Sequence, residues 1–373
     1  MKRYPAFDPP EYVAWKPDPA VVRGFAATLR RDKKRWKLIA ALEEKTLLAL
    51  YAGLLRARLH DIALKRWVRQ GVLSKAWLGT GEEAVAVGNA HALREGDLVG
   101  PMIRNAGACH ERGMPVAQML KAYLGTRDQI TRGRDLHTGD PEKGVLPPIS
   151  FVASLVPVFA GAALAFKLRS DPHLALTWVG DGASHTAEFH EGFNLAAVQH
   201  LPLIIVLQDN RVALGTALEE HQRGDLEDLA SSYGAAGIVC DGNNVLDVYA
   251  ATRLAADLCR QGRGPVILTA HTFRMGGHAT HDEQEARSLF PPNVFRSWGL
   301  RDPIGCYEAW LTGVATEGVR NGRISPAKLE SVEDEIVREV DAAAAEALAS
   351  RELHPPKPEE AEGGVTAGQG DQE

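Results

Sequence analysis

The chain has 373 residues, a formal net charge of −6, 45% hydrophobic and 24% charged residues, a balance typical of a globular protein with a large core. The negative charge argues against a broad phosphate-binding surface for nucleic acid. The four cysteines lie far apart, without the close pairs of a structural zinc site, which favours free buried thiols in a reducing compartment (Cys109, Cys240, Cys259 and Cys306).

The N-terminus carries basic residues but no apolar core segment of a signal peptide. No stretch approaches the roughly 18 uninterrupted apolar residues that a membrane-spanning helix requires. These patterns predict a cytoplasmic protein without a membrane span.

The first elements follow a proline-rich and basic beginning. Residues 1–38 show no sustained hydrophobic period, so we expect an extended N-terminal arm lying on the body or on a partner. The sequence becomes helical from Ala40, and leucines recur at three-to-four spacing as far as a stop at Gly71. A glycine turn then leads into a small-residue helix, "GTGEEAVAVGNAHAL". Residues 126–148 are dense in Gly, Pro, Arg and Asp and predict a long functional loop.

From residue 151 onward, apolar runs alternate with helical stretches. Nearly continuous apolar runs near residues 176, 205, 238 and 268 predict strands buried on both faces, with helices expected between them, including one in "DLEDLASSYG" (225–234). The predicted fold class is α/β, a doubly wound, mainly parallel sheet flanked by helices, with helical extensions at both ends. The main domain is expected at 39–312, a C-terminal helical segment at 313–351 and a disordered tail at 352–373.

Polar residues follow two of the predicted strands. Asp181 stands between Gly180 and Gly182, and Asn210 ends the next apolar run. Ligands of open parallel sheets bind beyond the carboxyl ends of the strands, so we expect Asp181 and Asn210 side by side. A carboxylate and an amide oxygen suit magnesium, while flanking glycines and a following helix N-terminus suit a diphosphate.

Other interpretations of these motifs remain open at this point. Gly-Asp-Gly and Asp-Asn can each form an ordinary turn. A nicotinamide-binding turn is a further alternative, but "GDGASHT" lacks the third glycine of G-x-G-x-x-G.

The stretch "GDGASHTAEFHEGFNLAAVQHLPLIIVLQDNRVALGT" resembles the thiamine diphosphate motif of the alpha chain of the 2-oxo acid dehydrogenase decarboxylase component. The segments "GTGEEAVAVG", "GRDLH", "CDGNNVLDVYAA" and "GPVILTAHTFRMGGHATHDE" resemble that family in the same order, so that the likeness covers about residues 45 to 312. The resemblance implies a thiamine diphosphate-binding fold.

The resemblance also implies roles for individual residues. Asp181, Asn210 and the backbone carbonyl of Val212 would bind Mg²⁺. Gly182 and Ala183, with the preceding Gly180, would lie against the diphosphate.

Three basic residues match the family as well. Arg104 matches an arginine that grips a phosphate, a role that its fork of donors suits. His278 matches the histidine over the reacting carbon of the cofactor, and His137 matches a second histidine at the mouth of the active site.

Several positions depart from the family pattern. Ile103 replaces the tyrosine that commonly precedes the phosphate-binding arginine, and Asp209 replaces the first Asn of the NN pair. Ala187 stands where glycine is usual, and Ala279 where animal homologues carry a regulatory serine.

Two residues that do match the family pattern share a helix face, and we expect them at a subunit contact (Glu191 and Asn194).

The resemblance further implies that the chain forms half of an active site, because the glutamate that activates the cofactor belongs to a separate beta chain in such enzymes. It implies an α2β2 heterotetramer that decarboxylates a small aliphatic, branched-chain 2-oxo acid and transfers the acyl group to a lipoyl domain of an acyltransferase core. Pyruvate or acetoin is the alternative substrate, and a non-catalytic paralogue is the alternative function.

Overall fold

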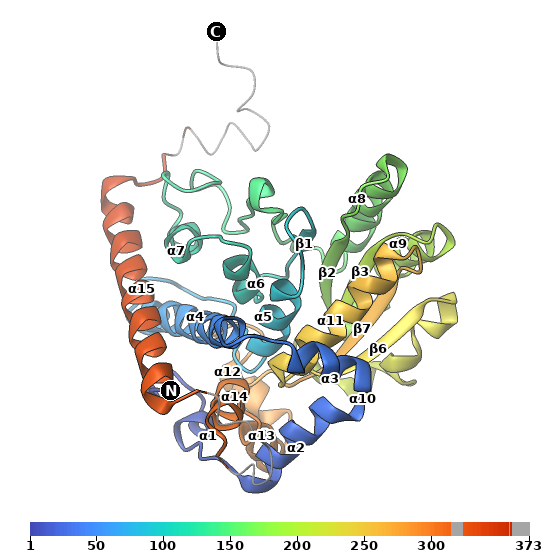
Figure 1. Cartoon of the computed structure of the whole chain (residues 1–373). Coiled ribbons are helices and arrows are strands. Elements are labelled where there is room, and N and C mark those ends of the chain that lie inside the picture. The colour runs from blue at the N-terminus through green and yellow to red at the C-terminus, as the bar shows by residue number, and fades with distance from the viewer. Residues whose placement is uncertain (315–323, 358, 360–373) are drawn as a thin grey trace.

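The computed structural model describes residues 1–314, 324–357 and 359. A five-stranded parallel sheet forms its centre, in the strand order β1-β2-β3-β7-β6 (Figure 1). The strands of this sheet are β1 (Leu98–Gly100), β2 (Ala175–Gly180), β3 (Leu203–Asp209), β6 (Ala236–Asp241) and β7 (Val266–His271). The predicted fold class and the four predicted strands are confirmed, and β1 was not predicted.

Helices surround this sheet, and a two-stranded antiparallel pair follows β3. That pair is β4 (Val212–Ala213) and β5 (Thr216–Ala217). The α-helices of the described residues are α1 (Pro10–Val13), α2 (Pro19–Arg31), α3 (Lys33–Ala40), α4 (Glu44–Arg69), α5 (Glu83–His91), α6 (Ala106–Glu111), α7 (Val116–Leu124), α8 (Leu155–Arg169), α9 (Ala187–Val198), α10 (Leu218–His221), α11 (Val245–Arg260), α12 (Glu283–Ser288), α13 (Pro292–Gly299), α14 (Pro303–Thr312) and α15 (Pro326–Leu353).

The apolar runs of the strands are explained by burial on both faces of the sheet. Successive side chains of a strand point to opposite faces. In β3, Ile204 and Val206 pack in one hydrophobic cluster with α5, α6 and α11. Leu203, Ile205 and Leu207 pack in another with α8 and α9. Helices therefore cover both faces, as expected for a parallel sheet.

A second helical layer lies outside α5. The long helix α4 is buried over most of its central part and packs with α7, α14 and α15 in a third hydrophobic cluster. Figure 1 shows α15 running along the side of the molecule opposite α8 and α9.

The extended conformation expected for residues 1–38 is wrong, because the arm contains α1, α2 and most of α3. Asp18 caps α2 by accepting hydrogen bonds from the backbone N–H groups of Ala20 and Val21. The buried face of α2 has helical spacing, which was hidden among lysines and arginines (Val22, Phe25, Ala26 and Leu29). The arm does lie on the body, because α2 packs against α14 and α3 packs against α11.

The helix expected in 225–234 is also absent. Two short 3₁₀ turns occupy this segment, Leu226–Asp228 and Ser231–Tyr233, and only Leu226 and Ala230 of the segment are buried. The long loop at 126–148 is confirmed, with one 3₁₀ turn at Pro141–Lys143. Of the C-terminal helical segment expected at 313–351, residues 315–323 lie outside the described residues, and α15 forms a helix from Pro326 to Leu353. The disordered tail predicted for 352–373 falls mainly on 358 and 360–373, which lie outside the described residues.

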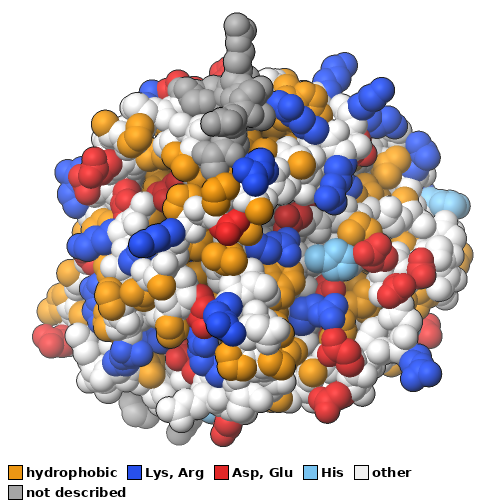
Figure 2. All heavy atoms as spheres, turned by 90° about the horizontal axis from the view of Figure 1, so that it is seen from below, with side chains coloured by type: hydrophobic (Ala, Val, Ile, Leu, Met, Phe, Trp, Pro, Cys, Tyr) orange, Lys and Arg blue, Asp and Glu red, His pale blue; other side chains and the backbone are white. Residues whose placement is uncertain are grey.

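The distribution of charged side chains on the surface and the state of the cysteines are as expected from the amino-acid composition. Figure 2 shows basic and acidic side chains interspersed with hydrophobic ones over the face that it displays. All four cysteines are buried and free. Among the described residues, no helix combines the length and the apolar character needed to cross a bilayer.

Candidate functional site

The loop after β2 and the turn after β3 meet at the carboxyl edge of the sheet. These strands pair in parallel, with Gly180 beside Gln208, so the residues that follow them emerge next to each other. The two segments are in contact, because a Cβ atom on Gly182 would collide with the side chain of Ala213. Asp181 and Asn210 therefore follow adjacent parallel strands at one edge of the sheet, and their role as metal ligands stays a prediction.

Asp181 is buried with an incomplete set of hydrogen bonds. Asp181 is only 2% exposed, and its Oδ1 accepts a hydrogen bond from the backbone N–H of Gly182 at 2.8 Å. Its Oδ2 is buried and has no partner within the described structure. Burial, followed by the nearby carboxylates of Asp209 and Glu82, raises the pKa of Asp181 to about 6. A cation at this edge would therefore stabilise the ionised form.

Asn210 is held by a glutamate from a distant segment. Its Nδ2 donates to Glu82 Oε1 at 2.8 Å, and its Oδ1 accepts from the backbone N–H of Val212 at 3.3 Å. Gln208 also donates to Glu82 Oε1, while Glu82 Oε2 is buried without a hydrogen-bond partner among the described groups. Glu82 thus links the end of β3 to the start of α5.

The turn between Asn210 and Val212 has an unusual backbone. Arg211 has φ 73°, the left-handed region that residues with a Cβ atom rarely adopt. The N–H of Leu218 donates to the Arg211 carbonyl at 3.0 Å, and Val212 pairs with Ala217 in the β4–β5 ladder. These contacts fix the turn, which brings Asn210 and Val212 to the same edge as Asp181.

Arg104 and His278 lie in contact, although they are 174 positions apart in the chain. Arg104 Nη2 donates to His278 Nδ1 at 3.2 Å and to the His278 carbonyl at 3.3 Å. Burial, Arg104 and Arg274 lower the pKa of His278 to about 4. His278 is therefore neutral near pH 7.

A cavity of about 320 Å³ gathers the remaining predicted residues. Arg104, His137, His278 and Ala183 all line it. Its other walls are largely apolar and include Trp77, Met102, Ile103, Phe151, Val152 and Trp178. The cavity therefore combines an arginine and two histidines with room for an aliphatic group.

His137 is oriented by hydrogen bonds at the mouth of this cavity. Its Nδ1 lies 2.7 Å from Asp135 Oδ1, and its Nε2 lies 3.2 Å from Ser150 Oγ. Both partners are exposed, so His137 belongs to the outer part of the site.

The positions that depart from the family pattern have identifiable surroundings. Ile103 lines the cavity. Ala187 is the first residue of α9, which Thr186 caps by accepting from the N–H of Phe189 at 3.3 Å. Ala279 is buried and donates its N–H to Asp282 Oδ1 at 2.8 Å. Asp209 is paired with His271, at 2.8 Å from Nδ1 to Oδ2.

Four residues of the site were not identified from the sequence: Glu82, Gln208, His271 and Arg274. A usable signal existed for Glu82, since two consecutive glutamates in "GTGEEAVAVG" precede a run of small and apolar residues that is buried as far as Ala90. Arg274 donates to the Leu214 carbonyl at 2.8 Å, and burial together with Arg104 lowers its pKa to about 10. Glu191 and Asn194 are exposed on α9, and their role at a subunit contact stays a prediction.

The residues at the strand ends fit a hydrated divalent ion bound to a phosphate group. The described residues contain no group of three or more His, Cys, Asp or Glu side chains arranged to hold a metal. The set at this edge is instead one carboxylate with an unpartnered buried oxygen, one amide and a nearby backbone turn. Such oxygen-only sets suit Mg²⁺, which keeps water and phosphate oxygens among its ligands.

Comparison with known proteins gives a consistent set of relatives. A family model described as the dehydrogenase E1 component matches residues 53–356. The alpha subunit of mitochondrial 2-oxoisovalerate dehydrogenase from Caenorhabditis elegans is 32% identical over 276 residues, which cover 72% of this chain and 63% of that protein. The chain thus spans less than two thirds of the length of this relative.

Two bacterial proteins are similar to a comparable degree. The alpha subunit of acetoin:2,6-dichlorophenolindophenol oxidoreductase from Bacillus subtilis is 32% identical, covering 65% of this chain and 74% of that protein. The alpha subunit of the pyruvate dehydrogenase E1 component from Rhizobium meliloti is 34% identical, covering 64% of this chain and 69% of that protein.

Proposed function

The chain belongs to the dehydrogenase E1 component family, and we propose that it is the alpha subunit of a thiamine diphosphate-dependent 2-oxo acid dehydrogenase. The observation that carries this proposal is the buried, unpartnered oxygen of Asp181, which lies beside Asn210 at two adjacent strand ends. The cavity that contains Arg104, His137 and His278 adjoins this edge through Ala183.

The cofactor would be held by the residues that the family resemblance indicates. Asp181, Asn210 and the carbonyl of Val212 would bind Mg²⁺, and Gly180, Gly182 and Ala183 would lie along the diphosphate. When bound, the cofactor would supply a nucleophilic carbon for the 2-oxo group and an electron sink for decarboxylation. The chain itself supplies binding, orientation and charge.

Arg104 has two functions in this proposal. Its guanidinium provides positive charge for a phosphate or a substrate carboxylate, and its N–H donor fixes the tautomer of His278. Because an arginine N–H can only donate, His278 Nδ1 must accept, and the proton of the neutral ring is on Nε2. That N–H can stabilise an oxygen that gains negative charge when the 2-oxo carbon is attacked.

His137 would act at the substrate entrance. Asp135 accepts from Nδ1 when that nitrogen carries the proton, which leaves Nε2 to interact with Ser150 or with a substrate. We assign His137 to substrate binding and proton transfer at the cavity mouth.

The chain would form the active site together with a beta subunit in an α2β2 heterotetramer. The exposed apolar side chains on and before α8 and α9 support a large protein contact on this side of the sheet (Phe151, Val152, Val158, Leu168, Leu195 and Val198). A lipoyl domain of an acyltransferase core would accept the acyl group.

The proposed substrate is a small aliphatic 2-oxo acid, with a branched chain as the first choice. The apolar walls of the cavity suit a short branched hydrocarbon. The segments "GEEAVAVG" and "DGNNVLDVYAAT" resemble the branched-chain group, whereas "QDNRVALGT" and "VASLVP" resemble the pyruvate group. Pyruvate or acetoin is the second candidate, since relatives with these substrates in their names are 32–34% identical to the chain.

Co-expression of the full chain with a beta subunit tests the proposal. Decarboxylation of 2-oxoisovalerate and pyruvate and cleavage of acetoin would be measured with an artificial electron acceptor, and cofactor binding by Mg²⁺-dependent thermal stabilisation. Turnover of one of these substrates is expected only when both Mg²⁺ and thiamine diphosphate are present. Stabilisation by the cofactor without any turnover would instead identify a non-catalytic paralogue.

A further inference from the structure

We propose that His271 is a positioning residue whose ion pair with Asp209 holds the turn that carries Asn210 and Val212. This inference rests on the proposed function, because it assigns that turn to metal binding. It gives a role to Asp209, the position at which the chain departs from the family's pair of asparagines.

The geometry places the two side chains together at the ends of neighbouring strands. Asp209 is the last residue of β3 and pairs in register with His271, the last residue of β7. His271 Nδ1 lies 2.8 Å from Asp209 Oδ2, and the N–H of Thr272 donates to the Asp209 carbonyl at 2.9 Å. The backbone and the side chain of Asp209 are therefore both tied to the end of β7.

The charge state of His271 follows from its two neighbours. Its Nε2 lies 2.6 Å from Glu227 Oε1, so that each ring nitrogen faces a carboxylate. A carboxylate only accepts hydrogen bonds when it is ionised, and both ring nitrogens must then donate, which requires an imidazolium. The hydrogen bond to Asp209 also raises the pKa of His271.

The imidazolium offsets a buried negative charge beside the metal-binding residues. The Asp209 side chain is only 3% exposed, whereas Glu227 is 49% exposed and can interact with water. Among the described ion pairs, His271 is the cationic partner of Asp209, so we expect the loss of His271 to leave this buried carboxylate unpaired and to loosen the turn.

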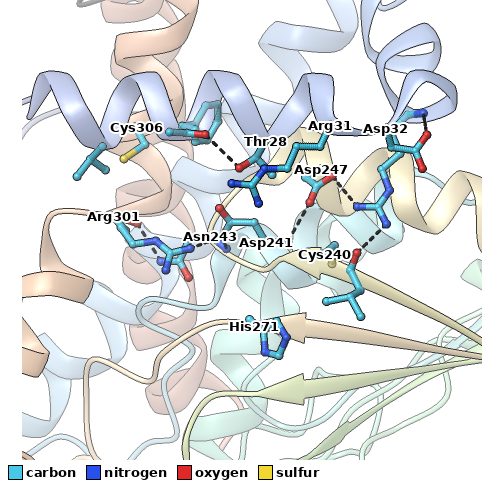
Figure 3. A pocket seen from close by; sticks show the side chains of 15 residues that line it. Thr28, Arg31, Asp32, Cys240, Asp241, Asn243, Asp247, His271, Arg301 and Cys306 are labelled. Atoms are coloured by element: carbon cyan, nitrogen blue, oxygen red, sulfur yellow. Dashed lines mark hydrogen bonds and ion pairs between the residues drawn. The ribbon is translucent and has the colours of Figure 1, made fainter. Parts of the chain in front are cut away.

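The space around His271 allows this residue to be replaced by an uncharged side chain of similar size. Figure 3 shows His271 at the tip of its strand, and the residue lines a cavity of about 570 Å³ between α2 and the ends of β6 and β7. We expect an uncharged side chain of similar size, such as methionine, to be accommodated beside this cavity.

The test is a double-mutant cycle in the full chain with His271→Met and Asp209→Asn. Backbone hydrogen exchange of residues 209–217 would be measured without ligand, and Mg²⁺ titrated in the presence of thiamine diphosphate on the complex with the beta subunit. With Asp209 present, His271→Met is expected to accelerate exchange of this segment and to weaken Mg²⁺ affinity by about 10–100-fold. In the Asp209→Asn background, which needs no counter-charge, the same change should alter either quantity by less than about two-fold.

A matched control is the His91→Gln variant, because His91 pairs with Glu111 at 2.6 Å in another part of the chain. It removes a comparable His–carboxylate pair and should leave exchange of 209–217 unchanged. Equal effects of His271→Met in both backgrounds, or unchanged exchange in all variants, would overturn the proposal. The unmodified complex could fail to bind the cofactor in the presence of Mg²⁺ while His271→Met still alters hydrogen exchange only when Asp209 is present. That result would refute the proposed function but not the coupling between His271 and Asp209.

Discussion

The replacement of Asp181 by asparagine should stabilise the ligand-free chain and abolish its response to the cofactor. Burial raises the pKa of Asp181 from 3.8 to about 6. Each pKa unit corresponds to about 1.4 kcal/mol, so ionised Asp181 destabilises the ligand-free fold by about 3 kcal/mol at pH 7. A neutral asparagine removes this cost, and a melting temperature about 4 °C higher is expected for a chain of this length.

The pH dependence of this effect has a definite sign. The folded-state pKa lies above the unfolded value, so the unfolded state releases the proton first as pH rises. The destabilising contribution of Asp181 is therefore absent below about pH 4, develops up to about pH 6 and is complete above it. The difference in melting temperature between Asp181→Asn and the unmodified chain should follow the same course.

Differential scanning fluorimetry of the full chain alone measures ligand-free stability, and the same assay on its complex with the beta subunit, with and without Mg²⁺ and thiamine diphosphate, measures stabilisation by the cofactor. Asp97→Asn is a contrasting control, because Asp97 is buried but paired with Arg260, and this variant should lower the melting temperature. The reasoning is refuted if Asp181→Asn lowers ligand-free stability. It is refuted equally if the variant keeps its Mg²⁺-dependent stabilisation by the cofactor.

Three further outcomes follow from the site and the core. His278→Ala should lower turnover by about 10²–10⁴-fold while Mg²⁺-dependent cofactor binding persists, and an unchanged rate would remove His278 from the mechanism. Glu82→Ala should raise the Mg²⁺ concentration for half-saturation by about 10–100-fold, because Asn210 loses its partner; an unchanged Mg²⁺ titration would contradict this. Burial lowers the pKa of His110 to about 4, below its unfolded value. Folding therefore loses about 3 kcal/mol of free energy of unfolding between pH 7 and pH 4, because the unfolded chain binds the proton first. Denaturant unfolding of His110→Asn should show a weaker pH dependence of stability in this range.

The sequence by itself determined four of the five strands of the sheet and the location of the site along the chain. Residues 203–209 form one apolar run, because alternate side chains enter hydrophobic clusters on opposite faces. The polar residues after β2 and β3 were recognisable because a buried strand ends where a carboxylate or an amide can reach a ligand. The spacing of Asp181 and Asn210 was sufficient to predict that they lie at one edge of the sheet, because neighbouring parallel strands end at the same edge.

The hydrogen-bond partners within the site were decided only by the tertiary structure. Glu82 reaches Asn210 across 128 positions, and Arg104 reaches His278 across 174. Local propensity and hydrophobic period carry no information on such contacts, which depend on how α5 and the loop after β7 pack against the sheet. Asp209 was recognised from the sequence as a departure from the family's pair of asparagines, but its counter-charge, His271, was not. Strands β3 and β7 are not consecutive in the chain, and the packed sheet as a whole sets the register that brings Asp209 and His271 together.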